Sequence, residues 1–373
     1  MRNYIRIFSC LTLCFFIVSC ATRPEEGSSI RTVLPTEAVD PVSPGDSPTV
    51  RTRDNNHSIL ALSAGGADGA FGAGVMAGWT ASGKRPKFDV VTGVSTGALL
   101  AVLSFLGPKY DGLAKELYTS QTNDQIFKSR GLNGLFSDSL FDNSPLKAQI
   151  EKHITPQLLA EVAAEHKKGR RLYVASTNLD AGQLVIWDMG DIAMGGRTNP
   201  VQHFQKVLRA SAAVPGFFPP VYIKPKRGVQ LRQAHVDGGV KEPILYANFM
   251  GASAAPQKDL YLIVNGTTRR FNDTNPVKPN LASIAQKTIF ELMRELQSDT
   301  IFRHYSRAKN SGIDFHLTSI PDDVPVSDKS LDFDPARMQI LFDAGFKIGL
   351  QGPTKWNTKP PSVLRETGEL ASK

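Results

Sequence analysis

The stretch VTGVSTGAL at residues 91–99 decides the fold that the sequence predicts. Ser95 stands at its centre, between Gly93 and Gly97, after an apolar run and before a run of helix formers. Gly-x-Ser-x-Gly in this setting is typical of a nucleophile elbow, a sharp turn between a strand and a helix that exposes a serine hydroxyl. Glycine at both flanking positions avoids a collision with the strand or the helix. Because short strings of glycine and serine also occur in ordinary turns, this stretch alone leaves both interpretations open.

A second glycine cluster follows an earlier apolar run. Residues 58–63, SILALS, predict a strand, residues 64–70, AGGADGA, a loop, and residues 71–81 a helix. Such a loop presents unshielded backbone amides, which suit either a bound phosphate or the oxyanion formed in ester hydrolysis. A relaxed dinucleotide-binding pattern at residues 72–77, GAGVMA, begins inside the predicted helix, and no P-loop lysine follows it. We therefore attribute these small residues to packing of the helix on a sheet.

Two strand–loop–helix units in succession predict a parallel sheet of the α/β class. The second unit has its strand at residues 88–92, then the elbow, then a helix that ends near Phe105. Each glycine cluster follows the carboxyl end of its strand, so both loops open on one edge of the sheet. We therefore expect Ser95 to converge with the amides of Gly65 and Gly66. The amino end of the helix after Ser95 also directs a positive dipole at the serine.

The later elements are predicted from apolar period and from glycine and proline positions. Helical character marks residues 111–168, in which residues 127–143 form either a lid that touches lipid or a long connection. Further strands are expected at 171–177, 183–188, 233–240, 260–264 and 314–318, and further helices at 199–210, 280–304 and 335–349. Residues 211–220, SAAVPGFFPP, predict a rigid apolar turn that suits one wall of an acyl pocket. Packing alone also explains its two phenylalanines.

Asp237 is the candidate catalytic base. It ends a short strand and precedes Gly238 and Gly239, which let the backbone turn and leave the carboxylate accessible. An aspartate in this position can instead cap its own turn. His235 lies on the same strand face, two residues earlier. Neighbouring positions on one strand do not place a histidine between aspartate and serine, so we interpret His235 as a core residue rather than as the base.

The first residues predict export and a lipid anchor. Residues 1–19 form a signal peptide with two arginines and an apolar segment that is too short to span a membrane stably. The sequence IVSC that ends at Cys20 resembles the lipobox of bacterial lipoproteins. This resemblance implies cleavage before Cys20 and lipidation of its thiol, and Ala21 implies sorting to the outer membrane, on its periplasmic or its cell-surface face. Cys10 and Cys14 lie in the removed segment, so no disulfide is expected.

Composition divides the rest of the chain into three parts. Residues 20–57 are rich in proline, serine and acidic residues and predict a disordered tether. Residues 58–350 form the folded hydrolase domain, and residues 351–373 a loose tail. The chain of 373 residues carries a net charge of +8 and a pI near 9.3, which suits anionic lipid headgroups, although such a charge is also common on solvated surfaces. Basic runs interleaved with aromatics are missing, which argues against nucleic-acid binding.

Four motifs in order resemble those of the patatin-like phospholipases over roughly residues 59–346. They lie at residues 65–69, 93–97, 211–220 and 237–239. The resemblance implies a three-layer α/β/α sandwich with a mainly parallel central sheet, and a Ser-Asp dyad in place of a triad. It implies Ser95 as nucleophile, Asp237 as its partner, and an oxyanion hole formed by Gly65, Gly66 and Ala67. The expected activity is hydrolysis of lipid carboxylic esters, of the phospholipase A or lysophospholipase type, with no cofactor and no metal ion.

Two positions depart from the family pattern. Ala64 replaces a first glycine, and Asp68 stands where many members have arginine or lysine. A carboxylate that points at an oxyanion hole disfavours the developing negative charge. These departures motivate an alternative, in which the protein is a non-catalytic outer-membrane lipoprotein that uses the same fold as a binding module.

Overall fold

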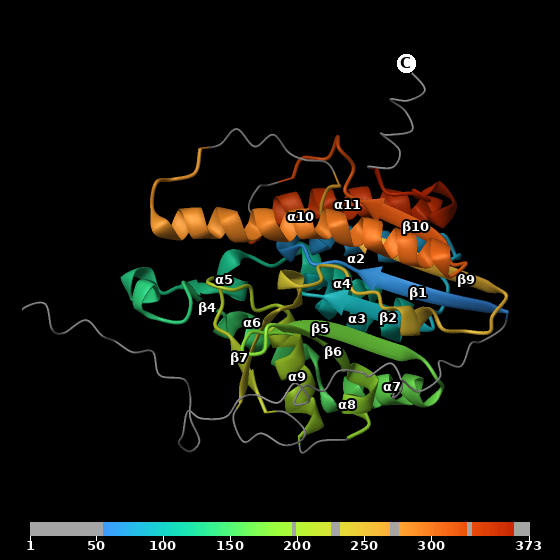
Figure 1. The fold of residues 1–373 in the computed structure, drawn as a ribbon, viewed down its shortest axis with the longest axis horizontal. Helices are drawn as coiled ribbons and strands as arrows, with labels where there is room; N and C mark the ends of the chain where they lie inside the picture. The colour runs from blue at the N-terminus through green and yellow to red at the C-terminus, as the bar shows by residue number, and fades with distance from the viewer. Residues whose placement is uncertain (1–54, 196–198, 225–231, 269–275, 327–329, 362–373) are drawn as a thin grey trace, which may run out of the picture.

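The computed structural model describes residues 55–195, 199–224, 232–268, 276–326 and 330–361. Within these residues, eight strands form one sheet in the order β10-β9-β1-β2-β5-β8-β7, with β6 paired to β5. Helices lie on both faces of this sheet, which gives three layers, α/β/α (Figure 1). The predicted fold class is therefore confirmed.

The sheet is mostly parallel, with an antiparallel end. β1 (Asn56–Leu62), β2 (Val90–Val94), β5 (Arg171–Asn178), β9 (Gln257–Val264) and β10 (Asp314–Ser319) run in one direction. β6 (Gln183–Asp188) and β8 (Gln233–Asp237) run antiparallel to β5, and β7 (Val221–Ile223) runs antiparallel to β8. β5 pairs Ala175 with Val94 and Ser176 with Asp237. This register brings the end of β8 level with the end of β2.

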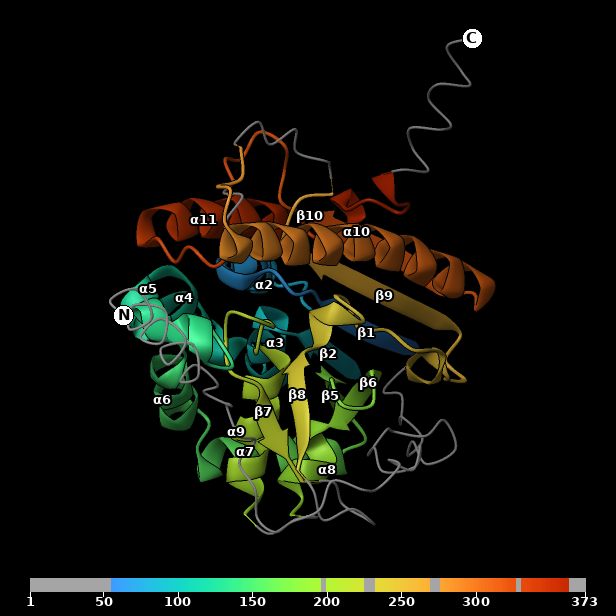
Figure 2. The ribbon, with the colours of Figure 1, turned by 60° about the vertical axis from the view of Figure 1, so that its left-hand side comes forward.

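Helices pack on the first face of the sheet through one large apolar core, which includes Leu60, Val91 and Ile263. These helices are α2 (Gly69–Ala81), α3 (Thr96–Leu106), α4 (Asp111–Thr119), α5 (Asn123–Ile126), α6 (Ser144–His153), α7 (Pro156–Lys167), α8 (Met189–Ala193), α9 (Pro200–Ser211) and α11 (Pro335–Gln351). The second face carries α10 (Leu281–Asn310) and residues 244–250, packed on Ile59 and Leu262 (Figure 2). Alternate strand residues thus serve opposite cores.

Short elements complete the chain. β3 (Lys128–Ser129) and β4 (Phe141–Asp142) form a small antiparallel pair, with the 3-10 turn η3 (Gly131–Phe136) between them. The other 3-10 turns are η1 (Gly66–Asp68), η2 (Pro108–Tyr110), η4 (Gly238–Val240), η5 (Asn248–Gly251) and η6 (Pro353–Lys355).

The small residues of α2 pack against another helix. A Cβ at Gly74 would lie 2.0 Å from the carbonyl oxygen of Phe342, and one at Gly78 would lie 2.1 Å from that of Phe346. Both carbonyls belong to α11. The interpretation of residues 72–77 as packing residues is supported, but Gly74 packs on α11 and not on the sheet, whereas a Cβ at Gly72 would meet Asn265, which directly follows β9. Sequence alone did not pair helices that are more than 250 residues apart.

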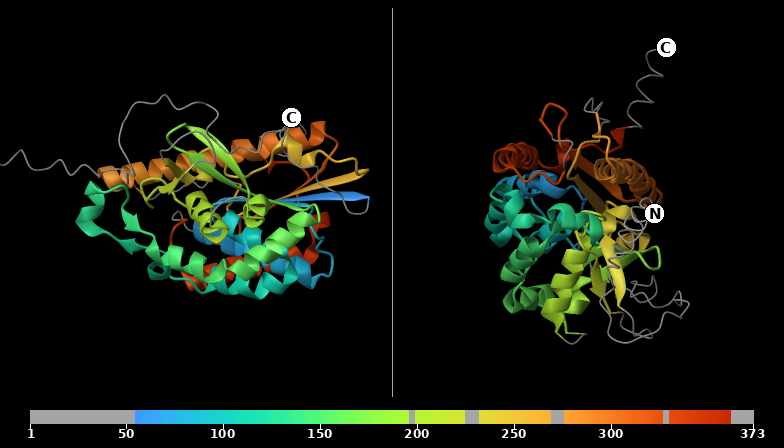
Figure 3. Two further views of the ribbon diagram at one scale, coloured as in Figure 1. Left: turned by 90° about the horizontal axis from the view of Figure 1, so that it is seen from below. Right: turned by 90° about the vertical axis from the view of Figure 1, so that its left-hand side faces the viewer.

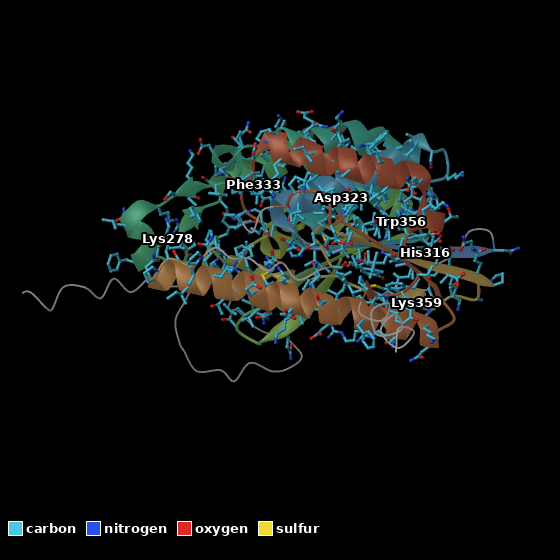
Figure 4. The ribbon with its side chains drawn as sticks, turned by 90° about the horizontal axis from the view of Figure 1, so that it is seen from above. Lys278, His316, Asp323, Phe333, Trp356 and Lys359 are labelled. Atoms are coloured by element: carbon cyan, nitrogen blue, oxygen red, sulfur yellow. The ribbon has the colours of Figure 1, made fainter. Side chains whose placement is uncertain are left out.

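The predicted loose tail is ordered in its first part. Trp356 is buried, and its ring lies 5.0 Å from the ring of Trp79. Asn357 pairs with Leu317 of β10 by two backbone hydrogen bonds. The fold therefore extends past residue 350 to the sheet edge, where Figure 4 labels Trp356. Residues 362–373, like the predicted signal peptide and most of the tether, lie outside the described residues.

Candidate active site

Ser95 joins β2 to α3 in the strained conformation of a nucleophile elbow. Its φ is 56° and its ψ −124°, a region that residues with a side chain rarely adopt. A Cβ at Gly93 would lie 2.2 Å from the carbonyl oxygen of Gly97, and one at Gly97 would lie 2.4 Å from that of Leu62. Neither position therefore has room for a side chain. The amide of Ser95 donates to Ser211 Oγ at 2.9 Å, which ties the elbow to the end of α9.

Asp237 lies beside Ser95 and is fully buried. Its Oδ1 accepts a hydrogen bond of 2.7 Å from the amide of Gly239, and its own amide donates to the carbonyl of Ala213 at 2.8 Å. The Ser95 side chain interacts with the carboxyl group and lowers its pKa. Asp237 Oδ2 has no hydrogen-bond partner of regular geometry among the described residues. Long or poorly aligned hydrogen bonds are common in catalytic pairs before substrate binds.

The environment of Asp237 suits a base. Burial raises its pKa to about 7, and this effect exceeds the lowering by Ser95 and by the Gly239 amide. A general base is most effective when its pKa lies near the operating pH. The two interpretations of Asp237 also prove compatible, since one carboxyl oxygen caps the turn and the other remains for the serine.

His235 is held away from this pair. Its Nδ1 lies 3.0 Å from Ser176 Oγ, and its ring lies 5.4 Å from the ring of Trp187. Burial lowers its pKa to about 4, so the ring is neutral at physiological pH. These contacts support the interpretation of His235 as a core histidine.

The glycine loop lies next to the elbow. A Cβ at Gly65 would lie 2.0 Å from the carbonyl oxygen of Asn265, and one at Gly66, whose φ is +59°, would lie 2.1 Å from that of Ser330. Asn265 holds the loop further, since its side chain donates to the carbonyl of Ser63 at 2.8 Å. Neither the Gly65 amide nor the Gly66 amide donates a hydrogen bond within the described residues. Both amides are available as oxyanion donors.

Ala67 does not fit its expected role. Its amide donates to the carbonyl of Ser330 at 2.8 Å, so it is already engaged. The η1 turn directs this amide towards the chain that precedes α11. The expected oxyanion hole therefore narrows to Gly65 and Gly66. Ser330 was missed because nothing local marks a residue that closes a loop more than 260 positions earlier. Asn265 could have been predicted from the sequence as a site residue, because it directly follows the β9 strand at the same sheet edge.

Asp68 is neutralised by a partner from the far end of the chain. Arg337 Nη1 lies 2.8 Å from Asp68 Oδ1, and its Nη2 donates to the carbonyl of Asp332. Burial still raises the pKa of Asp68 to about 6, against the lowering by Arg337 and Arg294. The carboxylate is therefore paired with a guanidinium instead of facing the oxyanion loop alone. Arg337 stands in the first turn of α11, where the sequence offered no sign of this contact.

A cavity of about 210 Å³ opens at Ser95, Gly65 and Gly66. Its walls are mostly apolar, and Phe218 and Val214 of the predicted acyl wall line it. Phe217 does not line the cavity and packs on Phe290, which does. The region 111–168, which had no assigned role, supplies Leu117, Tyr118, Gln121, Ile126, Leu146, Gln149, Ile150, His153 and Ile154. The far wall comes from α10 and α11, through Phe290, Met293, Arg294, Gln297 and Met338. The cavity thus suits a long apolar chain, and Ser95 is among the polar residues in its wall.

The described residues contain no cluster of histidine, cysteine, aspartate and glutamate side chains that could hold a metal ion. They also include no helix that is both long enough and apolar enough to cross a bilayer.

Comparison with known proteins defines the class. The family model described as "Patatin-like phospholipase" matches residues 60–249, just over half of the chain. The chain therefore belongs to the patatin-like phospholipase family, a family of lipid hydrolases. The match spans the glycine loop, the elbow and the Asp237 turn, but ends before Asn265 and Arg337.

A search of solved structures matched bacterial proteins. VipD from Legionella pneumophila is 14% identical, with a TM-score of 0.41 over 80% of this chain and 66% of that chain. ExoU from the type III secretion system of Pseudomonas aeruginosa, solved in complex with SpcU, is 15% identical, with a TM-score of 0.28 over 69% of this chain and 53% of that one. The alignments thus cover less than two thirds of either relative. A search of curated protein sequences gave no match.

Proposed function

We propose that this protein is a serine acyl hydrolase that cleaves carboxylic esters of lipids, of the phospholipase A or lysophospholipase type. The observation that carries the proposal is the pairing of the strained Ser95 with the buried Asp237 at one end of an apolar cavity. Two free amides at Gly65 and Gly66 line the same cavity. This combination provides a nucleophile, a base, an oxyanion site and space for an acyl chain.

The first half of the reaction forms an acyl-enzyme. Ser95 Oγ attacks the ester carbonyl carbon while Asp237 accepts the hydroxyl proton. The carbonyl oxygen becomes an oxyanion, which the Gly65 and Gly66 amides and the amino end of α3 stabilise. When the tetrahedral intermediate collapses, the ester C–O bond breaks and Asp237 returns the proton to the leaving alcohol. The acyl group remains on Ser95.

The second half regenerates the enzyme. Water attacks the acyl carbon and gives its proton to Asp237, and the oxyanion forms at the same amides. Collapse releases the fatty acid and restores the Ser95 hydroxyl with the proton held by Asp237. Because one carboxylate serves both halves, no histidine is needed.

Product analysis with defined phospholipids tests the proposal. Wild type should release free fatty acid, and Ser95→Ala should lower the rate by about 10⁴-fold or more. Asp237→Asn should lower it by about 10³-fold or more. Ser104→Ala is a matched control, since Ser104 is a buried serine of α3 whose hydroxyl has no hydrogen-bond partner in the described residues. Full activity in Ser95→Ala would exclude the mechanism.

A fluorophosphonate probe separates catalysis from the binding-module alternative. Covalent labelling of wild type at Ser95, absent in Ser95→Ala, requires an activated serine. Asp68 was one reason for that alternative, and its ion pair with Arg337 weakens it. A folded wild-type protein that resists labelling would favour the binding module.

We also propose that the hydrolase is tethered to the bacterial outer membrane through lipidated Cys20. The lipobox-like sequence that ends at this residue supports the anchor. Cys20→Ser should move the protein from the membrane fraction to the soluble fraction after a wash with high salt and alkaline carbonate, which removes proteins that are held by surface contacts alone. Unchanged membrane attachment would contradict lipidation at Cys20.

A further inference from the structure

The segment between α5 and α6 places apolar side chains in solvent. η3 projects from one end of the molecule, between the short strands β3 and β4 (Figure 1). Leu132 and Phe136 of this turn are 80% and 56% exposed. Two large apolar side chains on a projecting six-residue turn are unfavourable in water, and a partner or a membrane that covers the turn buries them.

This projection is continuous with the wall of the cavity. The amide of Phe141 donates to the carbonyl of Phe217 at 2.9 Å, which ties the base of the projection to the predicted acyl wall. Phe127 on the other side lies 5.7 Å from Phe218 and 6.4 Å from Phe333, ring to ring. Phe218 and Phe333 line the cavity. The base of the projection therefore packs directly on residues that line the cavity.

The start of α10 adds to the same end of the molecule. Val277 and Ile284 are 46% and 47% exposed, and Lys278 between them is exposed. The first turns of α10 lie at the end from which η3 projects, as the left view of Figure 3 shows, and Figure 4 labels Lys278 there. β1 also points its carboxyl end in this direction (Figure 1). In α/β folds, ligands approach from that edge.

We propose that η3 and the start of α10 form a docking surface for a lipid bilayer that contains anionic phospholipid. Leu132, Phe136 and Ile284 enter the interface between headgroups and acyl chains, and the exposed Lys128 and Lys278 contact phosphate groups. Docking in this way turns the opening of the cavity towards the bilayer, so that an acyl chain moves from lipid to protein without crossing water. The use of this surface for catalysis rests on the proposed lipid ester hydrolysis, but the docking itself does not.

Fluorescence of a tryptophan at the tip tests docking directly. The three native tryptophans are buried, with at most 6% exposure, so they report little on bound lipid. The full chain with Leu132→Trp is mixed with phosphatidylcholine/phosphatidylglycerol vesicles with and without brominated acyl chains. We expect brominated lipid to quench Leu132→Trp markedly more than wild type. The matched control is Phe302→Trp, at a 50% exposed position of α10 that is about 27 Å along the helix from Ile284.

Three results overturn the proposal. They are the absence of extra quenching in Leu132→Trp, equal quenching in Phe302→Trp, and a dimer that forms without lipid and is lost on Leu132→Ser, which assigns the surface to a second copy of the chain. Membrane attachment through an acylated Cys20 does not produce the expected difference, because it brings both tryptophan variants to the vesicle equally.

Activity on two substrates tests the role of the surface. Leu132→Ser combined with Phe136→Ser should lower hydrolysis of vesicle phospholipid by about tenfold or more, since two apolar side chains no longer enter the bilayer. Hydrolysis of a soluble nitrophenyl ester should stay at the wild-type rate. Unchanged vesicle hydrolysis would reject the docking role. Failure of wild type itself to cleave either ester would reject the proposed function, and quenching would still decide on docking.

Discussion

The two glycine turns that meet at the site are closed in different ways. The elbow at Ser95 is held by the adjacent strand, since a side chain at Gly97 would meet the carbonyl oxygen of Leu62, and by the end of α9, where Ser211 Oγ accepts the Ser95 amide. The glycine loop is held from a distance, because the carbonyl oxygen of Ser330 occupies the space beside Gly66 and accepts the amide of Ala67. The elbow is therefore held by segments between residues 62 and 211, whereas the glycine loop also depends on Asn265 and on Ser330 near the end of the chain.

The contacts that hold the two turns also differ in their position relative to the family match. The family match ends at residue 249 and includes everything that closes the elbow. Asn265, Ser330 and Arg337, which shape the glycine loop, lie beyond it. The contacts that hold the elbow therefore lie inside the matched range, whereas part of the contacts that hold the glycine loop lie after it.

Breaking the elbow should have the largest effect. Gly97→Ala places a Cβ 2.4 Å from two backbone carbonyls, so the turn must open and Ser95 must move. We expect an activity loss of at least about 10²-fold and a loss of about 1–3 kcal/mol in the free energy of unfolding, by chemical denaturation. Gly112→Ala is the control, since its Cβ meets nothing within 4 Å. A stable and fully active Gly97→Ala variant would mean that the elbow is less constrained than its geometry indicates.

Breaking the glycine loop should affect catalysis more selectively. Gly66→Ala combines a positive φ with a clash against Ser330, which shifts the Gly66 amide. The expected loss is about 10²-fold in kcat, the value of one oxyanion donor. Gly83→Ala is the matched control, because Gly83 also has a positive φ, +71°, but open space around it. Equal kinetic losses in the two variants would assign the effect to backbone strain alone.

Removing the positive charge of Arg337 should lower activity less than either glycine substitution. Arg337→Gln leaves the Asp68 carboxylate without its ion-pair partner beside the glycine loop. Loss of Arg337 raises the pKa of Asp68 further above about 6, so we expect little loss of kcat at pH 6. At pH 9, where the unpaired carboxyl is ionised and its charge opposes the oxyanion, kcat should fall by about tenfold with little change in KM. Adding Asp68→Asn to Arg337→Gln should restore most of the rate. If the double variant is as slow as Arg337→Gln, the arginine acts only by packing.

The smallest expected effect is a change in stability, and it is linked to the pH dependence of activity. Asp237 must be ionised to accept a proton, and burial raises its pKa to about 7. The value of kcat/KM should therefore increase with pH, with a midpoint at about pH 7. Stability should change in the opposite direction, because the folded state holds a proton that the unfolded state has already lost above its ordinary pKa. Asp237→Asn should then raise Tm by about 2 °C or more at pH 8, and by less at pH 5. A Tm difference that grows towards low pH would contradict a raised pKa.

The helices and strands that the sequence predicted best are those with strong local signals. The helix expected at 335–349 is α11, and its proline lies at the first position, where the missing amide costs nothing. The region 111–168 shows the opposite case. Its helices were expected, but their role as a wall of the cavity was not, because an apolar helix face does not say which elements it will meet.

The candidate site divides in the same way. Ser95 and Asp237 were found from the residues beside them, since a turn with a positive φ and an aspartate before two glycines leave a local signature. The pairing of the two depended on the register of β8 against β5, which the structure supplied. The engagement of the Ala67 amide with Ser330 could not be predicted for the same reason, because the partner of a single amide depends on which segment lies opposite it.

The sequence by itself determined the α/β class, the elbow, and the order of the motifs that places the chain in its family. These features follow from steric limits and apolar period over short spans of chain. Only the tertiary structure decided which amides remain free, what neutralises Asp68, and which surface surrounds the opening of the cavity. Each of these depends on contacts between segments up to about 270 residues apart, and no local pattern records such contacts.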